Sequence, residues 1–356
     1  MSKRRLALLR ETMRQEKFDA FVVSALPHIR YLAGFSGSNA LCIVRRSDVF
    51  FLTDSRYTLQ SKHEVKGWKR GISSNDLFDE CGKRGLFRGC RRIGFESHSL
   101  TYAQYRRLKK VSAGASFVPT TDIIEALVVV KQRGEVECMR EAISISDRVF
   151  GEIIGKIKPG VAELDIAAEI SYLHKTHGAE KDAFEPIVAS GERGALPHAR
   201  ASGKRIKRGE LVTLDFGCSV RGYNSDITRT VAVGRPTAEA KKMYHVVLHA
   251  QCAAIDAAKG GMSAKKLDAV ARGCIAKEGY GRYFTHSLGH GLGLQVHERP
   301  RVSSLSKEQL QVGSVITIEP GVYIPRLGGV RIEDDVLLKP DGCEVLNSAP
   351  KEFMVV

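Results

Sequence analysis

Short apolar runs alternate with polar, helix-like stretches in the first third of the chain. The runs at residues 21–23, 41–44, 49–52 and 93–95 have the length and composition of buried strands. Strands that alternate with helical segments are typical of an α/β domain, here with a mixed sheet. We therefore expect residues 1–121 to form an α/β domain.

The pattern changes near residue 121, where a longer amphipathic segment follows. Its apolar spacing predicts a helix from about Glu135 to Ile157, which the Pro-Gly pair at 159–160 ends. We place the domain boundary at this change, so the second domain spans residues 122–356.

The second domain repeats itself with an offset of 104 residues. Residues 209–217 (GELVTLDFG) align with residues 313–321 (GSVITIEPG), and the match keeps both glycines, a threonine and a carboxylate. Each half also has two predicted helices before its strand: about 135–157 and 162–177, then about 237–259 and 263–279. The shared order favours an internal duplication over chance similarity between two apolar strands.

Each half carries a pair of acids, the first on the strand and the second a few residues later: Asp215 with Asp226, and Glu319 with Glu333. The midpoints of the pairs fall near residues 220–221, beside a glycine, and at residue 326. A hairpin that turns at each midpoint would place the two acids of a pair opposite one another. Four clustered carboxylates are costly unless a cation neutralises them, so the sequence predicts a metal site.

His290 is the fifth candidate ligand. It lies in the segment HSLGHGLGLQVHE (286–298), where alternate glycines let the backbone approach a ligand closely. The segment lacks the G-x-G-x-x-G spacing of a Rossmann fingerprint and the G-K-[ST] of a P-loop. Oxygen ligands suit Mn²⁺, and an imidazole among them admits Co²⁺ or Zn²⁺.

The positive charge of the chain is concentrated in the first domain. The formal net charge is +15, and residues 1–121 contribute +13 of it, from 23 Lys plus Arg against 10 Asp plus Glu. These cations are not interleaved with aromatic residues and form no nucleic-acid-binding motif. A solvated surface is the favoured interpretation, and RNA binding is the minor alternative.

Composition and termini indicate a cytoplasmic protein. No apolar run approaches the roughly 20 residues that a membrane helix needs, so we expect no membrane partner. Arg10, Glu11 and Arg14 interrupt any apolar region of a signal peptide. The eight cysteines are scattered without C-x-x-C spacing, which predicts reduced, structural thiols.

The candidate ligands and their surroundings resemble the five-ligand dimetal centre of the pita-bread metallopeptidases. This family includes methionine aminopeptidase, aminopeptidase P and the Xaa-Pro dipeptidases (prolidases). The resemblance rests on the histidine-glycine segment and on residues 213–217 (TLDFG), 225–230 (SDITRT), 318–321 (IEPG) and 330–334 (VRIED). Creatinase shares the fold without the metal site, whereas all five ligands are present here.

Two segments of the first domain, YLAGFSGS (31–38) and FLTDSRY (51–57), are similar to the creatinase-type N-terminal domain. Simple methionine aminopeptidases lack that domain. The resemblance therefore implies an α+β pita-bread catalytic domain, a duplicated ααβββ unit, preceded by a creatinase-type α/β domain.

The resemblance implies two divalent ions per subunit, most simply Mn²⁺, that activate a water and polarise the scissile carbonyl. It assigns Asp215 to one ion, His290 and Glu319 to the other, and Asp226 and Glu333 to both. Glu319 would also move a proton. His198 and His297 match the family histidines that contact the substrate and stabilise the oxyanion.

His286 and Arg331 match positions typical of proline-specific members. Arg301 resembles the arginine with which prolidases hold the carboxylate of the dipeptide, a task that suits a planar guanidinium; the alternative is a surface arginine. The loop at 191–195 (GERGA) departs from the Gly-Pro-Asn type of loop in relatives.

These residues lead us to expect an Xaa-Pro dipeptidase that acts on small peptides with proline in second position. Aminopeptidase P acting on longer peptides is the alternative, and a non-catalytic binding protein on the same fold is less favoured. The N-terminal domain, His286 and Arg331 argue against a methionine aminopeptidase. The resemblance also implies a homodimer.

Overall fold

Two units make up the structure, a computed structural model that describes residues 2–112 and 114–356. They comprise Met1–Val128 and Val129–Val356. The boundary expected after residue 121 lies just before α6 (Ile123–Val128), the last helix of the first unit.

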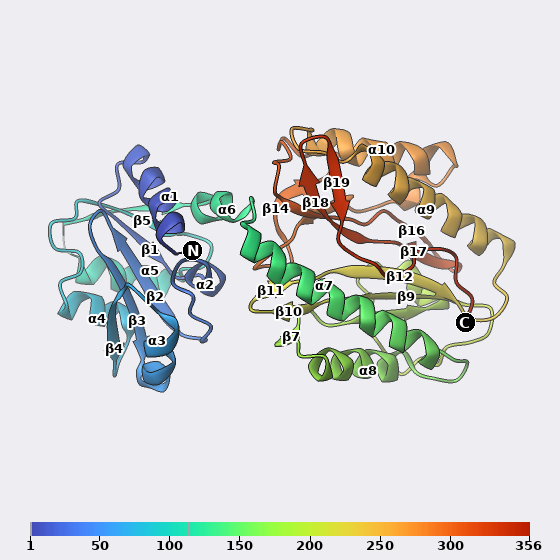
Figure 1. The fold of residues 1–356 in the computed structure, drawn as a ribbon, viewed down its shortest axis with the longest axis horizontal. Coiled ribbons are helices and arrows are strands. Elements are labelled where there is room, and N and C mark those ends of the chain that lie inside the picture. Colours follow the sequence, from blue (N-terminus) through green and yellow to red (C-terminus); the bar gives the residue numbers. More distant parts are fainter. Residues whose placement is uncertain (1, 113) are drawn as a thin grey trace. The chain divides into compact units, whose positions relative to one another are not determined.

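The first unit contains a six-stranded mixed sheet in the order β4-β3-β2-β1-β5-β6 (Figure 1). Its strands are β1 (Ala20–Val23), β2 (Ala40–Arg45), β3 (Val49–Asp54), β4 (Lys69–Ser73), β5 (Arg92–Glu96) and β6 (Ser116–Thr120). The four apolar runs in the sequence are β1, β2, β3 and β5. The edge strands β4 and β6 carry several exposed or half-buried residues, so no apolar run marks them in the sequence.

The helices of the first unit, besides α6, are α1 (Ser2–Gln15), α2 (Leu26–Ala33), α3 (Thr58–Glu64), α4 (Leu77–Lys83) and α5 (Tyr102–Val111). Side chains from α4 and α5, including Phe78 and Leu108, pack against sheet residues such as Ile43 and Phe95 in one core. The Asp76 carboxylate accepts a hydrogen bond from the Phe78 amide at 2.9 Å and so begins α4.

The second unit has four long helices in two pairs: α7 (Arg133–Ile153) with α8 (Glu163–Thr176), and α9 (Ala238–Ala257) with α10 (Ala264–Lys277). All four lie where the sequence predicts them, and a 3₁₀ turn at Ile154–Lys156 continues α7. Within this unit the strands lie between α8 on one side and α9 and α10 on the other (Figure 1).

Strands follow each helix pair. The first half contains β7 (Lys181–Asp182), β8 (Ile187–Ser190), β9 (Leu211–Phe216), β10 (Cys218–Val220), β11 (Tyr223–Asn224) and β12 (Ile227–Ala232). The second half contains β13 (Gly289–Gly291), β14 (Glu298–Val302), β15 (Val315–Ile318), β16 (Gly321–Ile324), β17 (Gly328–Arg331), β18 (Asp334–Lys339) and β19 (Gly342–Val345). The repeated order of helices and strands agrees with an internal duplication.

The register of the first hairpin differs from the one expected. Asp215 on β9 pairs with Thr228 on β12, so Asp215 and Asp226 are not directly opposite one another. The turn is formed by Arg221 and Gly222, whose φ angles are 49° and 79°. A two-residue hairpin turn of this kind needs positive φ at both positions, and this centres the hairpin one residue later than the midpoint of the two acids.

The second hairpin has the expected register. Gly321 pairs with Arg331 in β16–β17, and Ile318 pairs with Asp334 in β15–β18. The same register places Glu319 opposite Glu333. Both strands therefore deliver an acid to the same point.

The last residues of the chain lie along β12. The amide of Ala232 donates a hydrogen bond to the carbonyl of Met354 at 2.9 Å, and the amide of Val356 donates to the carbonyl of Ala232 at 2.8 Å. β12 is at one edge of the three-stranded sheet β12-β9-β8, so this segment pairs with the end of that edge strand, while the amide of Glu333 donates to the Thr228 carbonyl nearer its start.

Gly217, after β9, allows a close backbone approach. A Cβ atom at this position would lie 1.9 Å from the carbonyl oxygen of Ser225, closer than atoms can approach. Gly217→Ala should therefore destabilise the fold by roughly 1–3 kcal/mol, because the backbone must shift to admit a methyl group. Urea unfolding of the purified variant measures the loss.

Gly273→Ala on α10 is the matched control, since its new methyl group would meet no heavy atom within 4 Å. Alanine is favoured over glycine in a helix, so this variant should gain about 0.5–1 kcal/mol. A Gly217→Ala protein as stable as wild type would contradict the close approach.

Candidate metal centre and active site

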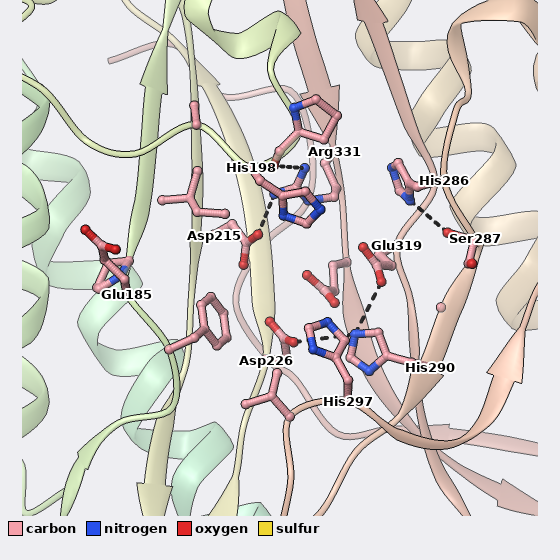
Figure 2. A pocket seen from close by; sticks show the side chains of 18 of the residues that line it. Glu185, His198, Asp215, Asp226, His286, Ser287, His290, His297, Glu319 and Arg331 are labelled. Atoms are coloured by element: carbon pink, nitrogen blue, oxygen red, sulfur yellow. Dashed lines mark hydrogen bonds and ion pairs between the residues drawn. The ribbon is translucent and has the colours of Figure 1, made fainter. Parts of the chain in front are cut away.

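A cavity of about 770 Å³ in the second unit brings the sequence-predicted site residues together (Figure 2). All ten line it: His198, Asp215, Asp226, His286, His290, His297, Arg301, Glu319, Arg331 and Glu333. They come from both halves of the duplication, mostly from strands or the residues next to strand ends. The two hairpins and the histidine-glycine segment therefore converge on one space.

A compact cluster of ligand atoms occupies the cavity. One ligand atom from each of Asp226, His290 and Glu333 lies within 4.8 Å of the others. His290 Nε2 is 3.4 Å from a carboxylate oxygen of Glu319 and 3.8 Å from one of Asp226, as the dashed lines in Figure 2 show. Carboxylate oxygens around one imidazole form a donor set that suits Mn²⁺, Co²⁺ or Zn²⁺.

Asp215 stands slightly apart from this cluster, because one of its oxygens pairs with the Arg331 guanidinium. The other oxygen, Oδ1, is buried without a hydrogen-bond partner among the described residues, and so is Oδ1 of Asp226. Buried polar atoms of this kind are rarely left without a partner. A divalent cation would supply one, so the residues present fit a metal ion.

Burial and mutual repulsion perturb the acids strongly. Burial, and then the negative charge of Asp215, raises the pKa of Glu333 to about 8. Burial and the charge of Glu333 hold the pKa values of Asp226 and Glu319 well above their ordinary range. A bound cation would remove this repulsion and let the carboxylates ionise together.

His290 has the charge state that a metal ligand would need. Burial, followed by the neighbouring His297, lowers the pKa of His290 to about 3, so its imidazole carries no charge at neutral pH. The rings of His290 and His297 lie 4.3 Å apart between centroids. A metal binds imidazole in this neutral form.

The sequence interpretation missed Tyr323, which connects two of the expected substrate-binding residues. Its hydroxyl accepts a hydrogen bond from Arg331 Nη1 at 2.7 Å and lies 2.8 Å from His286 Nε2. Tyr323 lies on β16, four residues after Glu319, and this even spacing in extended chain is the sequence signal that could have marked it.

Two further residues hold the ligands in place. Arg229 is buried, and its guanidinium donates to the carbonyl oxygen of Glu333 and to the Asp334 carboxylate. Asp335 accepts a hydrogen bond from the amide of Asp226 at 3.1 Å. Arg229 lies within the segment 225–230, and Asp335 directly follows the segment 330–334. Nothing in the sequence distinguishes a charged residue that supports a neighbouring ligand from any other charged residue.

The expected substrate-contacting residues differ in exposure. His198 and Arg301 are exposed at the cavity, whereas His286 and Arg331 are more enclosed. Arg301 Nε donates a hydrogen bond to the Ser287 hydroxyl at 3.0 Å. The unusual loop at 191–195 forms a 3₁₀ turn that packs against β17 through Gly194.

The chain matches family models along nearly its whole length. Residues 137–340 match the metallopeptidase family M24 model, and residues 5–130 match the Creatinase/Prolidase N-terminal domain model. The chain belongs to metallopeptidase family M24. This membership confirms the pita-bread catalytic domain and the creatinase-type first domain, and it makes the chain a peptidase of a family that uses divalent metal ions.

Individual relatives are similar over their full length. The Xaa-Pro dipeptidase of Pyrococcus horikoshii is 41% identical over 97% of this chain and 97% of its own. The structure of the Xaa-Pro dipeptidase from Bacillus anthracis superposes with a TM-score of 0.97 at 38% identity, covering 100% of both chains. An X-Pro aminopeptidase from Thermotoga maritima gives a TM-score of 0.91 at 38% identity, covering 97% of this chain and 100% of its own.

Among the residues that the structure describes, we find no helix with the length and apolar character required to cross a membrane.

Metal content distinguishes the roles of two ligands. If Glu333 bridges two ions, as the resemblance implies, Glu333→Ala should lose both, whereas His290→Ala should chiefly weaken one. Dialysis against a chelator and then against Mn²⁺, followed by elemental analysis, gives the ions per chain. His249→Ala, an exposed histidine on α9, is the control and should keep wild-type content. Full occupancy in Glu333→Ala would show that this carboxylate is not the bridge.

Proposed function

We propose that this chain is a prolidase that hydrolyses the Xaa-Pro bond of dipeptides with two divalent ions. The observation that carries the proposal is the cavity itself, where a carboxylate and histidine cluster and the Arg301 side chain share one space that can hold a small peptide. The names of the full-length relatives support the same activity. We therefore place dipeptides ahead of longer peptides as substrates.

The proposed ligands are the five predicted from the sequence: Asp215 for one ion, His290 and Glu319 for the other, and Asp226 and Glu333 for both. When bound, the ions would activate a water and polarise the scissile carbonyl. We favour Mn²⁺ because four of the five ligands are carboxylates, with Co²⁺ or Zn²⁺ as alternatives.

Glu319 is our candidate for proton transfer. Without a metal ion, burial and the charge of Glu333 raise its pKa well above the ordinary range, and a bound cation would lower this pKa so that the ionised carboxylate could act as a base. In the proposed reaction, its carboxylate accepts the proton of the attacking water and returns it to the proline nitrogen.

His297 and His198 are our candidates for stabilising the developing oxyanion. Both line the cavity, and burial lowers the pKa of His297, so the ring is a neutral donor at neutral pH. A donor held in a partly dehydrated site is more effective than one in water.

His286 and Arg331 line the cavity, and the Tyr323 hydroxyl is hydrogen-bonded to both. Burial, and then the charge of Arg331, lowers the pKa of His286 to about 4, and burial raises the pKa of Tyr323 to about 12. These two rings therefore stay uncharged over the physiological range. We propose that they position the proline ring, whose tertiary amide needs a dedicated pocket.

Two further proposals concern the whole protein. A homodimer is supported by the family resemblance. A cytoplasmic location is supported by the cysteines, all eight of which are free thiols.

One experiment separates the proposed function from its rivals, an aminopeptidase P and a non-catalytic binding protein. It compares hydrolysis of an Xaa-Pro dipeptide, an Xaa-Pro tripeptide and a Met-Ala peptide with Mn²⁺ present. A prolidase should prefer the dipeptide, an aminopeptidase P should cleave the tripeptide, and a binding protein should cleave none of them.

Replacing His297 should affect the transition state more than substrate binding. An oxyanion donor interacts most strongly where charge develops, and its loss typically costs about 10²–10³ in kcat. His297→Ala should therefore lower kcat on an Xaa-Pro dipeptide with little change in KM. Wild-type kcat in this variant would remove His297 from the mechanism.

Replacing Arg301 separates the two proline-specific activities. If its guanidinium binds the carboxylate of the dipeptide, Arg301→Ala should raise KM for dipeptides by about tenfold or more, because a charge-assisted hydrogen bond worth roughly 1.5–3 kcal/mol is lost. A tripeptide carries its carboxylate one residue further away and should be affected much less. Steady-state kinetics on both substrates measure the difference.

Arg200→Ala is the matched control, since Arg200 is a second exposed arginine that lines the cavity. It should change the two KM values to a similar, smaller extent. If wild type cleaves both substrates equally well and Arg301→Ala changes neither, the activity is that of an aminopeptidase P.

A further inference from the structure

A second group of metal-ligating side chains lies in the first unit. His28 on α2, His98 in the turn after β5 and Glu125 on α6 each offer one ligand atom, and these three atoms lie within 4.8 Å of one another. The three residues are far apart in the sequence, and all belong to the unit Met1–Val128. None of them takes part in the proposed peptidase site.

A buried carboxylate orients the first of these histidines. Glu96 at the end of β5 lies 2.5 Å from His28 Nδ1, and both side chains are almost completely buried. The other oxygen of Glu96 accepts hydrogen bonds from the amides of Ser24 and Ala25 at 2.6 and 2.8 Å, which fix the carboxylate. With the Nδ1 proton directed to Glu96, Nε2 is the nitrogen that a metal would use.

This arrangement is the one in which histidine ligands of metal ions are normally held. A ligating imidazole usually donates its other ring N–H to a carboxylate, which fixes the ring and increases its basicity as a ligand. Glu96 supplies that carboxylate for His28 and is itself anchored at the start of α2. The pair therefore has a preorganised geometry of the kind that metal binding favours.

The other two side chains complete a donor set. His98 Nδ1 is 3.3 Å from Glu125 Oε1. Ligands of a tetrahedral zinc ion are separated by roughly this distance, about 3.3 Å, because Zn–N and Zn–O bonds are about 2.0–2.1 Å long. The His98 side chain is 42% exposed and that of Glu125 is 20% exposed, so an ion can enter and a water can fill a fourth position.

The alternative is a surface ion pair between His98 and Glu125 with a structural histidine beside it. That interpretation explains His28 through its pair with the buried Glu96, but it gives no reason for His98 and Glu125 to meet beside the His28 ring. The His28 and His98 rings lie 6.0 Å apart in an edge-on arrangement, so protonating both would place two positive charges together. A metal ion uses both rings in their neutral form.

We propose that His28, His98 and Glu125 form a binding site for one divalent transition-metal ion, and we favour Zn²⁺. Two imidazoles and one carboxylate favour zinc, cobalt or nickel over manganese, whereas the carboxylate-rich centre of the second unit suits manganese. The site would cross-link α2, the turn after β5 and α6, which are otherwise joined by long stretches of chain.

Metal counting on the full-length protein tests the proposal. Chelator-treated wild type, His98→Ala and Glu125→Gln are dialysed against the same low Zn²⁺ concentration, and bound zinc per chain is measured by elemental analysis. Each variant should bind one zinc ion fewer than wild type. With Mn²⁺ in place of Zn²⁺, the three proteins should bind equal amounts.

His63→Ala, an exposed histidine on α3 of the same unit, is the control and should retain the wild-type zinc content. Hydrolysis of an Xaa-Pro dipeptide should be unchanged in all variants. Equal zinc content in wild type, His98→Ala and Glu125→Gln would overturn the proposal, as would loss of zinc from His63→Ala. The difference in zinc count does not depend on catalysis, so it is informative even if the peptidase proposal fails.

Discussion

The burial of like charges at one point is the constraint on which the second unit depends. Carboxylates from four separate segments meet in the cavity, and burial together with repulsion raises the pKa values of Asp226, Glu319 and Glu333. Arg331 neutralises only part of this charge through its pair with Asp215. Isolated buried charges of this kind cost several kcal/mol each, so the fold is organised to receive divalent cations there.

The two halves of the duplication are joined at the same place. Arg229 belongs to the first half, but its guanidinium binds Asp334 and the Glu333 carbonyl in the second half and the carbonyl of Ala349. Its side chain is only 2% exposed, so these bonds are protected from water. Because a guanidinium presents several donors in a fixed plane, it sets the spacing between the hairpins that carry the ligands.

Periodicity and duplication were sufficient to predict the four helices of the second unit and the four carboxylates, and the glycine-flanked His290 completed the five candidate ligands. The other five predicted site residues came from the family resemblance, and all ten are among the residues that line the cavity. The first hairpin was predicted in the wrong register. Its turn is formed by the two residues with positive φ, Arg221 and Gly222, and is not centred on the midpoint of Asp215 and Asp226. Strands β4 and β6 were not predicted, because edge strands tolerate polar side chains and these two therefore contain no apolar run. The contacts of Tyr323 and Asp335 arise only in the folded unit, where tertiary packing decides which neighbours meet.

The pairing of the C-terminal segment with β12 has a consequence for the synthesis of this protein. Residues 349–356 leave the ribosome after every other part of the second unit, yet they cover the edge of the strand that follows Asp226 and accept bonds from Arg229. Until these residues are released, Ala232 at the end of β12 lacks its two backbone partners and the Arg229 guanidinium lacks two of its acceptors, so the first hairpin is completed last.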